Sequence, residues 1–152
     1  MQEIYLLVGE IIEVSQVIEY NLVLVIKYSE YIKKFKGKGN ITHKDFMLFE
    51  KEVQKMHNGL LSSTLGQIIN KVKEIDIFNS ESIEKLFSLL KTRNDLVHKF
   101  FKDNNFNEIE RFSNKYNQIV ASLGAVLKNM QDINAKLCDI INGQQIEFSN
   151  LF

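Results

Sequence analysis

Two side chains that can act on a phosphate lie five residues apart in segment 93–98, whose sequence is RNDLVH and which we call the hexad. Arg93 is one of two arginines against seventeen lysines, and its planar guanidinium makes two-point contacts with phosphate or carboxylate that an ammonium makes poorly. His98 carries the side chain best suited to proton transfer near neutral pH. Asn94 and Asp95 lie between them and can orient either group. The hexad is therefore the candidate site.

Helical geometry limits how these side chains meet. On a regular helix Asn94 and His98, four residues apart, project from the same face, whereas Arg93 lies about 140° around the axis from His98. The guanidinium can approach the imidazole by leaning or through a helix distortion, or a second subunit can present its own hexad across a two-fold axis. Arginine, asparagine and histidine together suit a phosphodiester, because the guanidinium neutralises the phosphate and the imidazole moves a proton.

A purely structural role is the alternative. In that interpretation Arg93 makes a surface salt bridge, Asn94 caps a helix, and His98 is an ordinary, partly buried imidazole. A motif as short as arginine and histidine five residues apart also arises by chance. The residues alone leave both interpretations open.

The composition is that of one globular domain. Of the 152 residues, 45% are hydrophobic and 25% charged, which favours a folded chain over a disordered one. We expect a single helical domain over residues 1–145 and a short C-terminal tail over 146–152. Because the formal net charge is zero, any contact with nucleic acid must be local.

The sequence predicts a cytoplasmic protein that needs neither metal nor cofactor. Cys138 is the single cysteine, so no internal disulfide can form, and no cluster of metal ligands stands out. We expect Cys138 to be a small core residue, as free cysteines often are. The N-terminus lacks the positive region of a signal peptide. The most apolar run, residues 22–26, is far shorter than the roughly 18 residues that indicate a membrane span.

Apolar residues recur at steps of three and four, which predicts helices throughout. From Ile4 to Ile32 they follow a strict 4-3-4-3 pattern, interrupted by Ser15 and Ser29. This pattern indicates one helix of about 30 residues, or two helices if the chain breaks near Ser15. A second apolar set widens this face, as burial against more than one neighbour requires. The glycines and lysines of 36–40 then stop the helix.

Three or four further helices follow. They are expected from Thr42 or His43 to 58–59, from about Ser63 to near Ile77, from a Ser80 cap past Arg93, and from Ile109 to 142–143. Asn94 and Asp95 could interrupt the third of these. Short polar connectors join the helices. The predicted fold is all-α, an antiparallel up-and-down bundle of four to five helices, two of them long.

The hexad, preceded by the apolar segment 86–90 and followed by the aromatic pair Phe100 and Phe101, resembles the signature of HEPN domains (higher eukaryotes and prokaryotes nucleotide-binding). These are all-α bundles with an Arg-x(4–6)-His motif, commonly with a polar residue directly after the arginine. The resemblance is sharp over residues 83–101. It implies a homodimer in which two hexads meet in a cleft.

The resemblance also implies an activity. Active HEPN proteins are metal-independent endoribonucleases, often toxins or effectors of phage defence and abortive infection, in which the 2′-hydroxyl of RNA attacks the adjacent phosphate. His98 is then the acid/base, Arg93 stabilises the charged phosphorane, and Asn94 orients one of them. The substrate is RNA, because the chemistry needs the 2′-hydroxyl. An antitoxin protein is an implied partner.

One position departs from the toxin branch that is paired with a nucleotidyltransferase antitoxin. A tyrosine two residues after the histidine commonly receives the inhibitory nucleotide there, but this chain has Phe100, which lacks a hydroxyl. Control by adenylylation at that position is therefore in question. The alternative function is a catalytically inactive HEPN-like module that binds a nucleotide or a protein, as the partner of a nucleotidyltransferase or another antitoxin or defence component.

The remaining polar candidates favour structural roles. His43 is expected as a solvated residue at a helix start, and His57 near a helix end, where a positive charge is favourable. Arg111, flanked by two glutamates, is expected in a surface ion pair. Four lysines between positions 33 and 38 can follow an RNA backbone, although a solvated helix end is the simpler interpretation.

Overall fold

The computed structural model describes residues 2–104, 109 and 113–152. These residues form α1 (Gln2–Phe35), α2 (His43–Leu61), α3 (Leu65–Lys73), α4 (Ser80–His98), α5 (Phe100–Asp103) and α6 (Asn114–Ser149). No strand occurs in the described ranges. The predicted all-α bundle with two long helices is confirmed.

Helix α1 follows the predicted stripe closely. Its regularly spaced apolar residues are buried, and Ile4, Ile11 and Ile18 are fully inaccessible to solvent. Ser15 is buried among them, and its hydroxyl donates a hydrogen bond to the carbonyl of Ile12 (2.7 Å), which satisfies the one polar group of the stripe. The helix ends before Gly37, whose φ of +77° is the left-handed conformation typical of a glycine that follows a helix.

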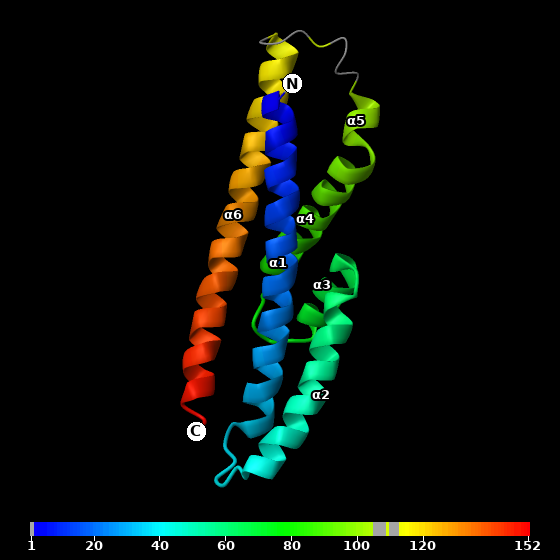
Figure 1. Ribbon diagram of the computed structural model, residues 1–152. Coiled ribbons are helices and arrows are strands. Elements are labelled where there is room, and N and C mark those ends of the chain that lie inside the picture. Colours follow the sequence, from blue (N-terminus) through cyan, green and yellow to red (C-terminus); the bar gives the residue numbers. More distant parts are fainter. Residues whose placement is uncertain (1, 105–108, 110–112) are drawn as a thin grey trace.

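The two long helices are parallel neighbours. The Tyr116 hydroxyl contacts Glu3 (3.2 Å) near their first turns, and Lys36 pairs with Glu147 (2.9 Å) near their last. Both helices descend from the upper to the lower end of the molecule in Figure 1. This direction follows from the predicted up-and-down order, in which α2 and α4 both ascend, so the chain is again beside the start of α1 when α6 begins.

Helix α6 continues beyond the end predicted at residues 142–143 and reaches Ser149. Gln144 is buried, and its amide nitrogen donates to the carbonyl of Val25 (3.1 Å) and the hydroxyl of Ser29 (2.9 Å). Phe148 packs edge-on against Tyr31. These contacts with α1 outweigh the roughly 1 kcal/mol that glycine costs inside a helix. Residues 146–149, predicted as part of a tail, are therefore helical.

A cluster of aromatic rings closes the lower end of the bundle. Helix α2, whose predicted start was Thr42 or His43, begins at His43, and the Thr42 side chain caps it by accepting a hydrogen bond from the Asp45 backbone. The cluster joins α1, α2 and the end of α6 through Tyr31, Phe35, Phe46, Phe49, Phe148 and Phe152. It forms a second, smaller core beside the main one.

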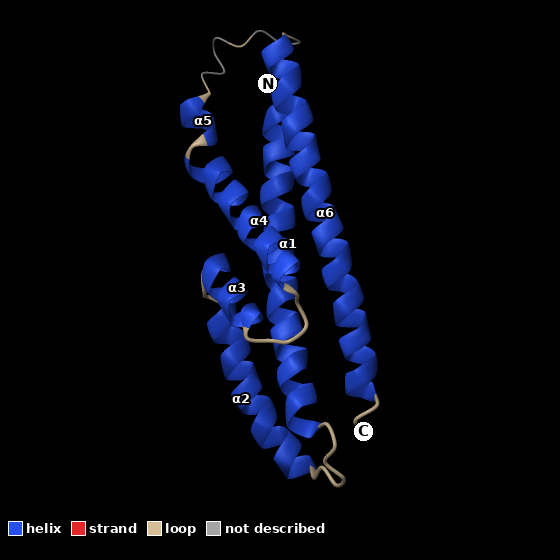
Figure 2. Cartoon of the chain, turned by 180° about the vertical axis from the view of Figure 1, so that it is seen from behind, coloured by secondary structure: helices blue, strands red, loops and turns tan. Residues whose placement is uncertain are grey.

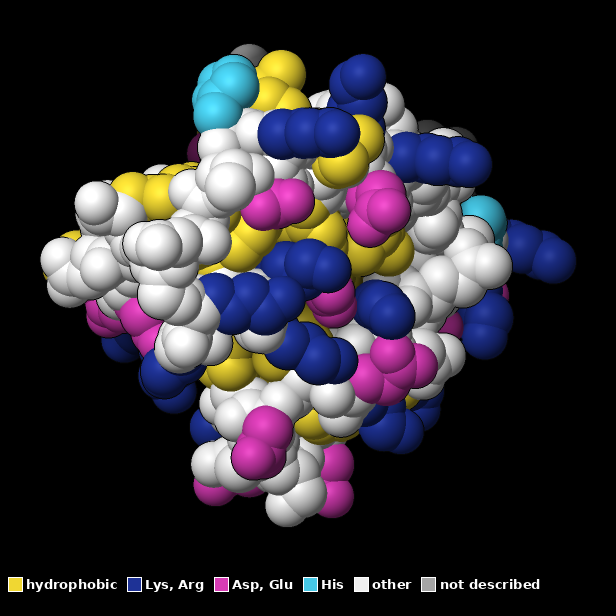
Figure 3. All heavy atoms as spheres, turned by 90° about the horizontal axis from the view of Figure 1, so that it is seen from below, with side chains coloured by type: hydrophobic (Ala, Val, Ile, Leu, Met, Phe, Trp, Pro, Cys, Tyr) yellow, Lys and Arg dark blue, Asp and Glu magenta, His cyan; other side chains and the backbone are white. Residues whose placement is uncertain are grey.

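Lysines surround this aromatic end. Lys33, Lys34, Lys36 and Lys38 are exposed, and Figure 3 shows basic and acidic side chains intermixed on this face of the molecule. The Lys34 ammonium lies 5.2 Å from the centroid of the Phe49 ring, and Lys36 is paired with Glu147. The lysine-rich segment is therefore a solvated helix end, as the simpler interpretation predicts, and contact with an RNA backbone stays a prediction.

Helices α3 and α4 complete the bundle against α1 (Figure 2). Thr64 and Gln67 form a reciprocal capping box at the start of α3. This helix ends at Lys73, earlier than predicted. Helix α4 begins at Ser80, and the cap is the Asn79 side chain, one residue before the expected Ser80. None of the helices in the described ranges combines the length and apolar character needed to cross a membrane.

Candidate functional site

The hexad forms the last turns of α4, which ends at His98. Asn94 and Asp95 do not interrupt the helix, and Leu96 is buried in the main core, which fixes this end of α4 to the bundle. Asp95 forms an exposed ion pair with Lys99, one turn further along the chain (3.5 Å). Asp95 therefore has a local partner of small energetic weight.

Arg93 and Asn94 are joined directly. A guanidinium nitrogen of Arg93 (Nη1) donates to the carboxamide oxygen of Asn94 at 3.1 Å, and both residues are half-buried. Within the described parts of the chain this is the one hydrogen bond of the guanidinium, and no carboxylate lies within 4.0 Å of it. Asn94 thus orients the guanidinium and leaves most of its five N–H donors available.

The His98 imidazole is exposed on the final residue of α4. It makes no hydrogen bond or ion pair to any described residue. It follows Asn94 by one helical turn, so the two share a face of α4, but Arg93 and His98 of one chain do not form a hydrogen bond. One subunit therefore presents an oriented guanidinium and a separate, accessible imidazole.

The structure differs from the purely structural interpretation at each of its three residues. Arg93 makes no ion pair within the described ranges, Asn94 lies inside α4 and caps nothing, and His98 is exposed. His98 is the basic residue in the last turn of α4, where a positive charge suits the helix dipole, but this does not account for the orientation of Arg93 by Asn94. The hexad therefore remains the candidate site.

Exposed apolar side chains adjoin the hexad. Val97 is 48% exposed, and Tyr5 of α1 stacks on Phe101 with ring centroids 5.1 Å apart. We call Tyr5, Val97 and Phe101 the apolar patch. Exposed apolar groups gathered beside a polar site are typical of a surface that binds another protein chain.

His57 lies in a different environment from the one predicted. It is a buried residue of α2 that packs edge-on against Tyr20 of α1, and its Nδ1 has no hydrogen-bond partner among the described residues. Burial, with a smaller effect of the Lys27 charge, lowers the pKa of His57 below its usual value of 6.5. The expectation of a favourably placed positive charge at a helix end is therefore wrong.

Lowering the pH should destabilise the protein through His57. Its pKa is lower in the folded than in the unfolded chain, so its contribution to stability is complete above the unfolded value of about 6.5 and declines as the pH falls toward the folded value. We expect the free energy of unfolding in urea to decrease between pH 7.5 and 5.5, and His57→Gln to lessen this decrease.

The control for this measurement is His43→Gln, because His43 is exposed at the start of α2, as predicted. This variant should keep the full pH dependence. An identical pH dependence in His57→Gln and in the unmodified protein would contradict the assignment.

The other sequence candidates lie apart from the hexad. Cys138 is exposed, with the Asn21 amide 3.9 Å from its sulfur, so the prediction of a core position is wrong. Arg111 lies outside the described residues. The described residues contain no group of three or more histidine, cysteine or acidic side chains placed to hold a metal ion.

Comparison of the chain with protein-family models, with curated protein sequences and with solved structures gives no match.

Proposed function

We propose that the protein is a metal-independent endoribonuclease of the HEPN type, a cytoplasmic toxin or phage-defence effector that cleaves single-stranded RNA at the hexad. One observation carries the proposal. The Arg93 guanidinium has no carboxylate partner in the described chain and is oriented by Asn94, one turn before the exposed imidazole of His98. An oriented cation and an accessible acid/base are the two groups that phosphodiester cleavage needs.

In the proposed reaction the ribose 2′-hydroxyl attacks the adjacent phosphorus. His98 takes the proton from this hydroxyl, and the Arg93 guanidinium neutralises the negative charge that develops on the phosphorane oxygens. The P–O5′ bond then breaks, and the leaving oxygen receives a proton from the imidazolium that His98 has become. The products are a 2′,3′-cyclic phosphate and a 5′-hydroxyl. Asn94 acts through Arg93 and is a positioning residue.

A homodimer supplies the complete site. Arg93 and His98 of one chain are not joined by a hydrogen bond, so a second hexad across a two-fold axis is the simplest way to place both groups at one phosphate. The exposed side chains of the apolar patch, Val97 within the hexad and the stacked Tyr5 and Phe101, are apolar surface that a second copy can cover. RNA enters between the two α4 ends in this arrangement.

A second candidate function also starts from the observation that Arg93 and His98 of one chain do not form a hydrogen bond with each other. An inactive module would use the Arg93 guanidinium as an anion clamp for a nucleotide or for an acidic group of a partner protein, such as a nucleotidyltransferase or another antitoxin. Phe100, which stands at the position of the modified tyrosine, argues against regulation by adenylylation there. This candidate function predicts that the protein binds a nucleotide or a partner protein and that no RNA cleavage product forms.

Incubation of the purified protein with single-stranded RNA in EDTA tests the proposal. We expect cleavage products with 2′,3′-cyclic phosphate ends, identified by mass spectrometry, and a dimer in analytical ultracentrifugation. Cleavage that requires an added metal ion would contradict the proposed chemistry. Nucleotide binding that Arg93→Ala weakens, without any RNA product, would favour the inactive module.

A further inference from the structure

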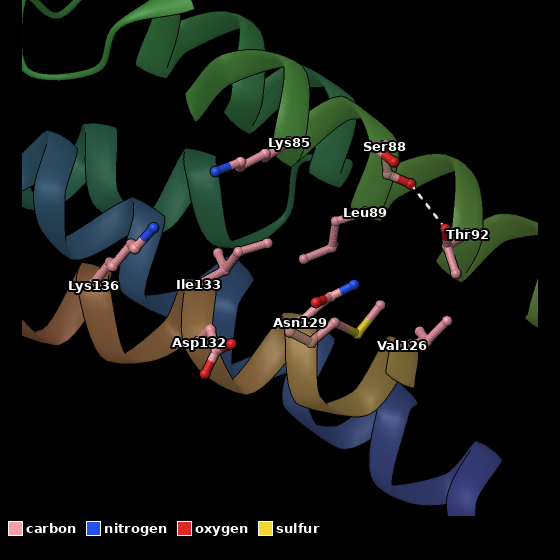
Figure 4. Close-up of a pocket in the computed structure, with 10 residues that line it drawn as sticks. Lys85, Ser88, Leu89, Thr92, Val126, Asn129, Asp132, Ile133 and Lys136 are labelled. Carbon is pink, nitrogen blue, oxygen red and sulfur yellow. Dashed lines mark hydrogen bonds between the residues drawn. The ribbon is translucent and has the colours of Figure 1, made fainter. Parts of the chain in front are cut away.

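A groove between α4 and α6, separate from the hexad, has two adjoining parts (Figure 4). One part is lined by polar and apolar side chains in similar measure and has a volume of about 300 Å³, and the other is mainly apolar and has a volume of about 110 Å³. Lys85, Ile133 and Lys136 line both parts. They therefore mark the junction between the mixed and the apolar part, and we call the whole feature the α4–α6 groove.

Two lysines from opposite walls meet at the junction. Lys85 projects from α4 and Lys136 from α6, and both side chains extend into the gap between the helices (Figure 4). The Asn129 carboxamide also points into the groove, whereas the Asp132 carboxylate points away from α4. Two ammonium groups from opposite walls can therefore approach one anion, with an amide available as a further hydrogen-bond donor.

Glu81 already shows how the lysines act on a carboxylate. Its Oε1 lies 3.0 Å from the ammonium of Lys85. The hydrogen bond from Lys85 and the charge of Lys85 lower the pKa of Glu81, and the charge of Lys136 adds to this effect. An exposed ion pair one helical turn apart has small energetic weight. The anionic group of a ligand can therefore take the place of Glu81.

The apolar part of the groove suits a small hydrocarbon body. It is lined by side chains from the end of the α3–α4 connection, from α4 and from α6, namely Ile77, Phe78, Leu86, Ile133, Leu137 and Ile140. Ile77 is 42% exposed although it is a large apolar side chain. Covering such surface is favourable by about 25 cal/mol per Å².

We infer that the α4–α6 groove binds a small amphipathic anion. Its aliphatic or aromatic body lies in the apolar part, and its carboxylate or phosphate lies between Lys85 and Lys136. This site differs from the proposed nuclease site, because neither Arg93 nor His98 lines the groove. The inference is therefore independent of whether the protein cleaves RNA.

Binding of octanoate and octyl phosphate, measured by isothermal titration calorimetry, tests the inference. We expect both to bind more tightly than 1-octanol, which lacks the charge, and than acetate, which lacks the hydrocarbon. The tighter of the two identifies the preferred anionic group. Amide chemical shifts in a ¹⁵N spectrum should change at Lys85, Ile133 and Lys136.

Three variants separate the charge effect from simple apolar binding. Lys136→Gln should weaken octanoate binding about tenfold, the loss expected for one charge-assisted hydrogen bond. Glu81→Gln should strengthen binding several-fold, because it removes the competing carboxylate. Lys55→Gln, an exposed position on α2, should leave it unchanged. Equal binding of octanol and octanoate, no measurable binding of either anion, or an unchanged affinity in both Lys136→Gln and Glu81→Gln would overturn the inference.

Discussion

Replacing His98 by alanine should reduce the rate of RNA cleavage by a factor of about 10² to 10⁴, the range typical for loss of a general acid or base. The imidazole is exposed and makes no hydrogen bond or ion pair with the described residues, so the variant should fold normally and keep its circular dichroism spectrum and dimer. The rate is measured with single-stranded RNA in EDTA. His43→Ala, which removes an exposed histidine from α2, should retain full activity.

A mixing experiment distinguishes a site within one subunit from a site between two. Arg93→Ala and His98→Ala should each be inactive alone. If Arg93 of one subunit acts with His98 of the other, a mixed dimer of the two variants contains one intact site, and activity should return on mixing.

Cleavage that persists in His98→Ala alone would contradict the role of the imidazole. Activity that does not return would place both groups in the same subunit.

Ile18→Ala should lower the free energy of unfolding by about 2–5 kcal/mol, the range for large-to-small substitutions in a core. Ile18 lies in the middle of α1 and is fully buried. The removed side chain leaves a cavity that the two long helices can close only partly, because both are fixed by contacts along their whole length. Urea denaturation monitored by circular dichroism gives the measurement.

The neighbouring residue provides the control. Val17 is 43% exposed on the same turn, and Val17→Ala should change the free energy of unfolding by less than about 1 kcal/mol, as surface substitutions usually do. A comparable loss in both variants would show that Ile18 and Val17 are equally buried and that α1 turns a different face to the core. A small loss in Ile18→Ala alone would show that the site relaxes after truncation.

The sequence predicted the features that depend on local periodicity. The stripe of α1 was readable because burial on one face repeats every three to four residues, and it included Ser15, whose hydroxyl bonds to its own helix. The helix start at Thr42 or His43 and the glycine stop at Gly37 were equally local. Features of this kind need no knowledge of where other elements lie.

Features that depend on distant neighbours were missed. The end of α6 was placed at Gly143, because its contacts with Val25 and Ser29 on α1 are not visible in the local pattern. Cys138 and His57 were misplaced for the same reason, since their exposure is decided by helix packing. The hexad could be singled out by residue type, but the Arg93–Asn94 bond required the side-chain geometry.

The pairing of α1 with α6 affects how the chain folds during its synthesis, because the two helices are far apart in the sequence. Asn21 of α1 bonds to Asn134 of α6, 113 residues later. At a translation rate of roughly 5–20 residues per second, α1 emerges about 6–23 seconds before the part of α6 that covers it. During this interval the apolar stripe of α1 lacks α6, the helix that packs along its length, so a nascent chain stalled before residue 114 should be a strong client for chaperones.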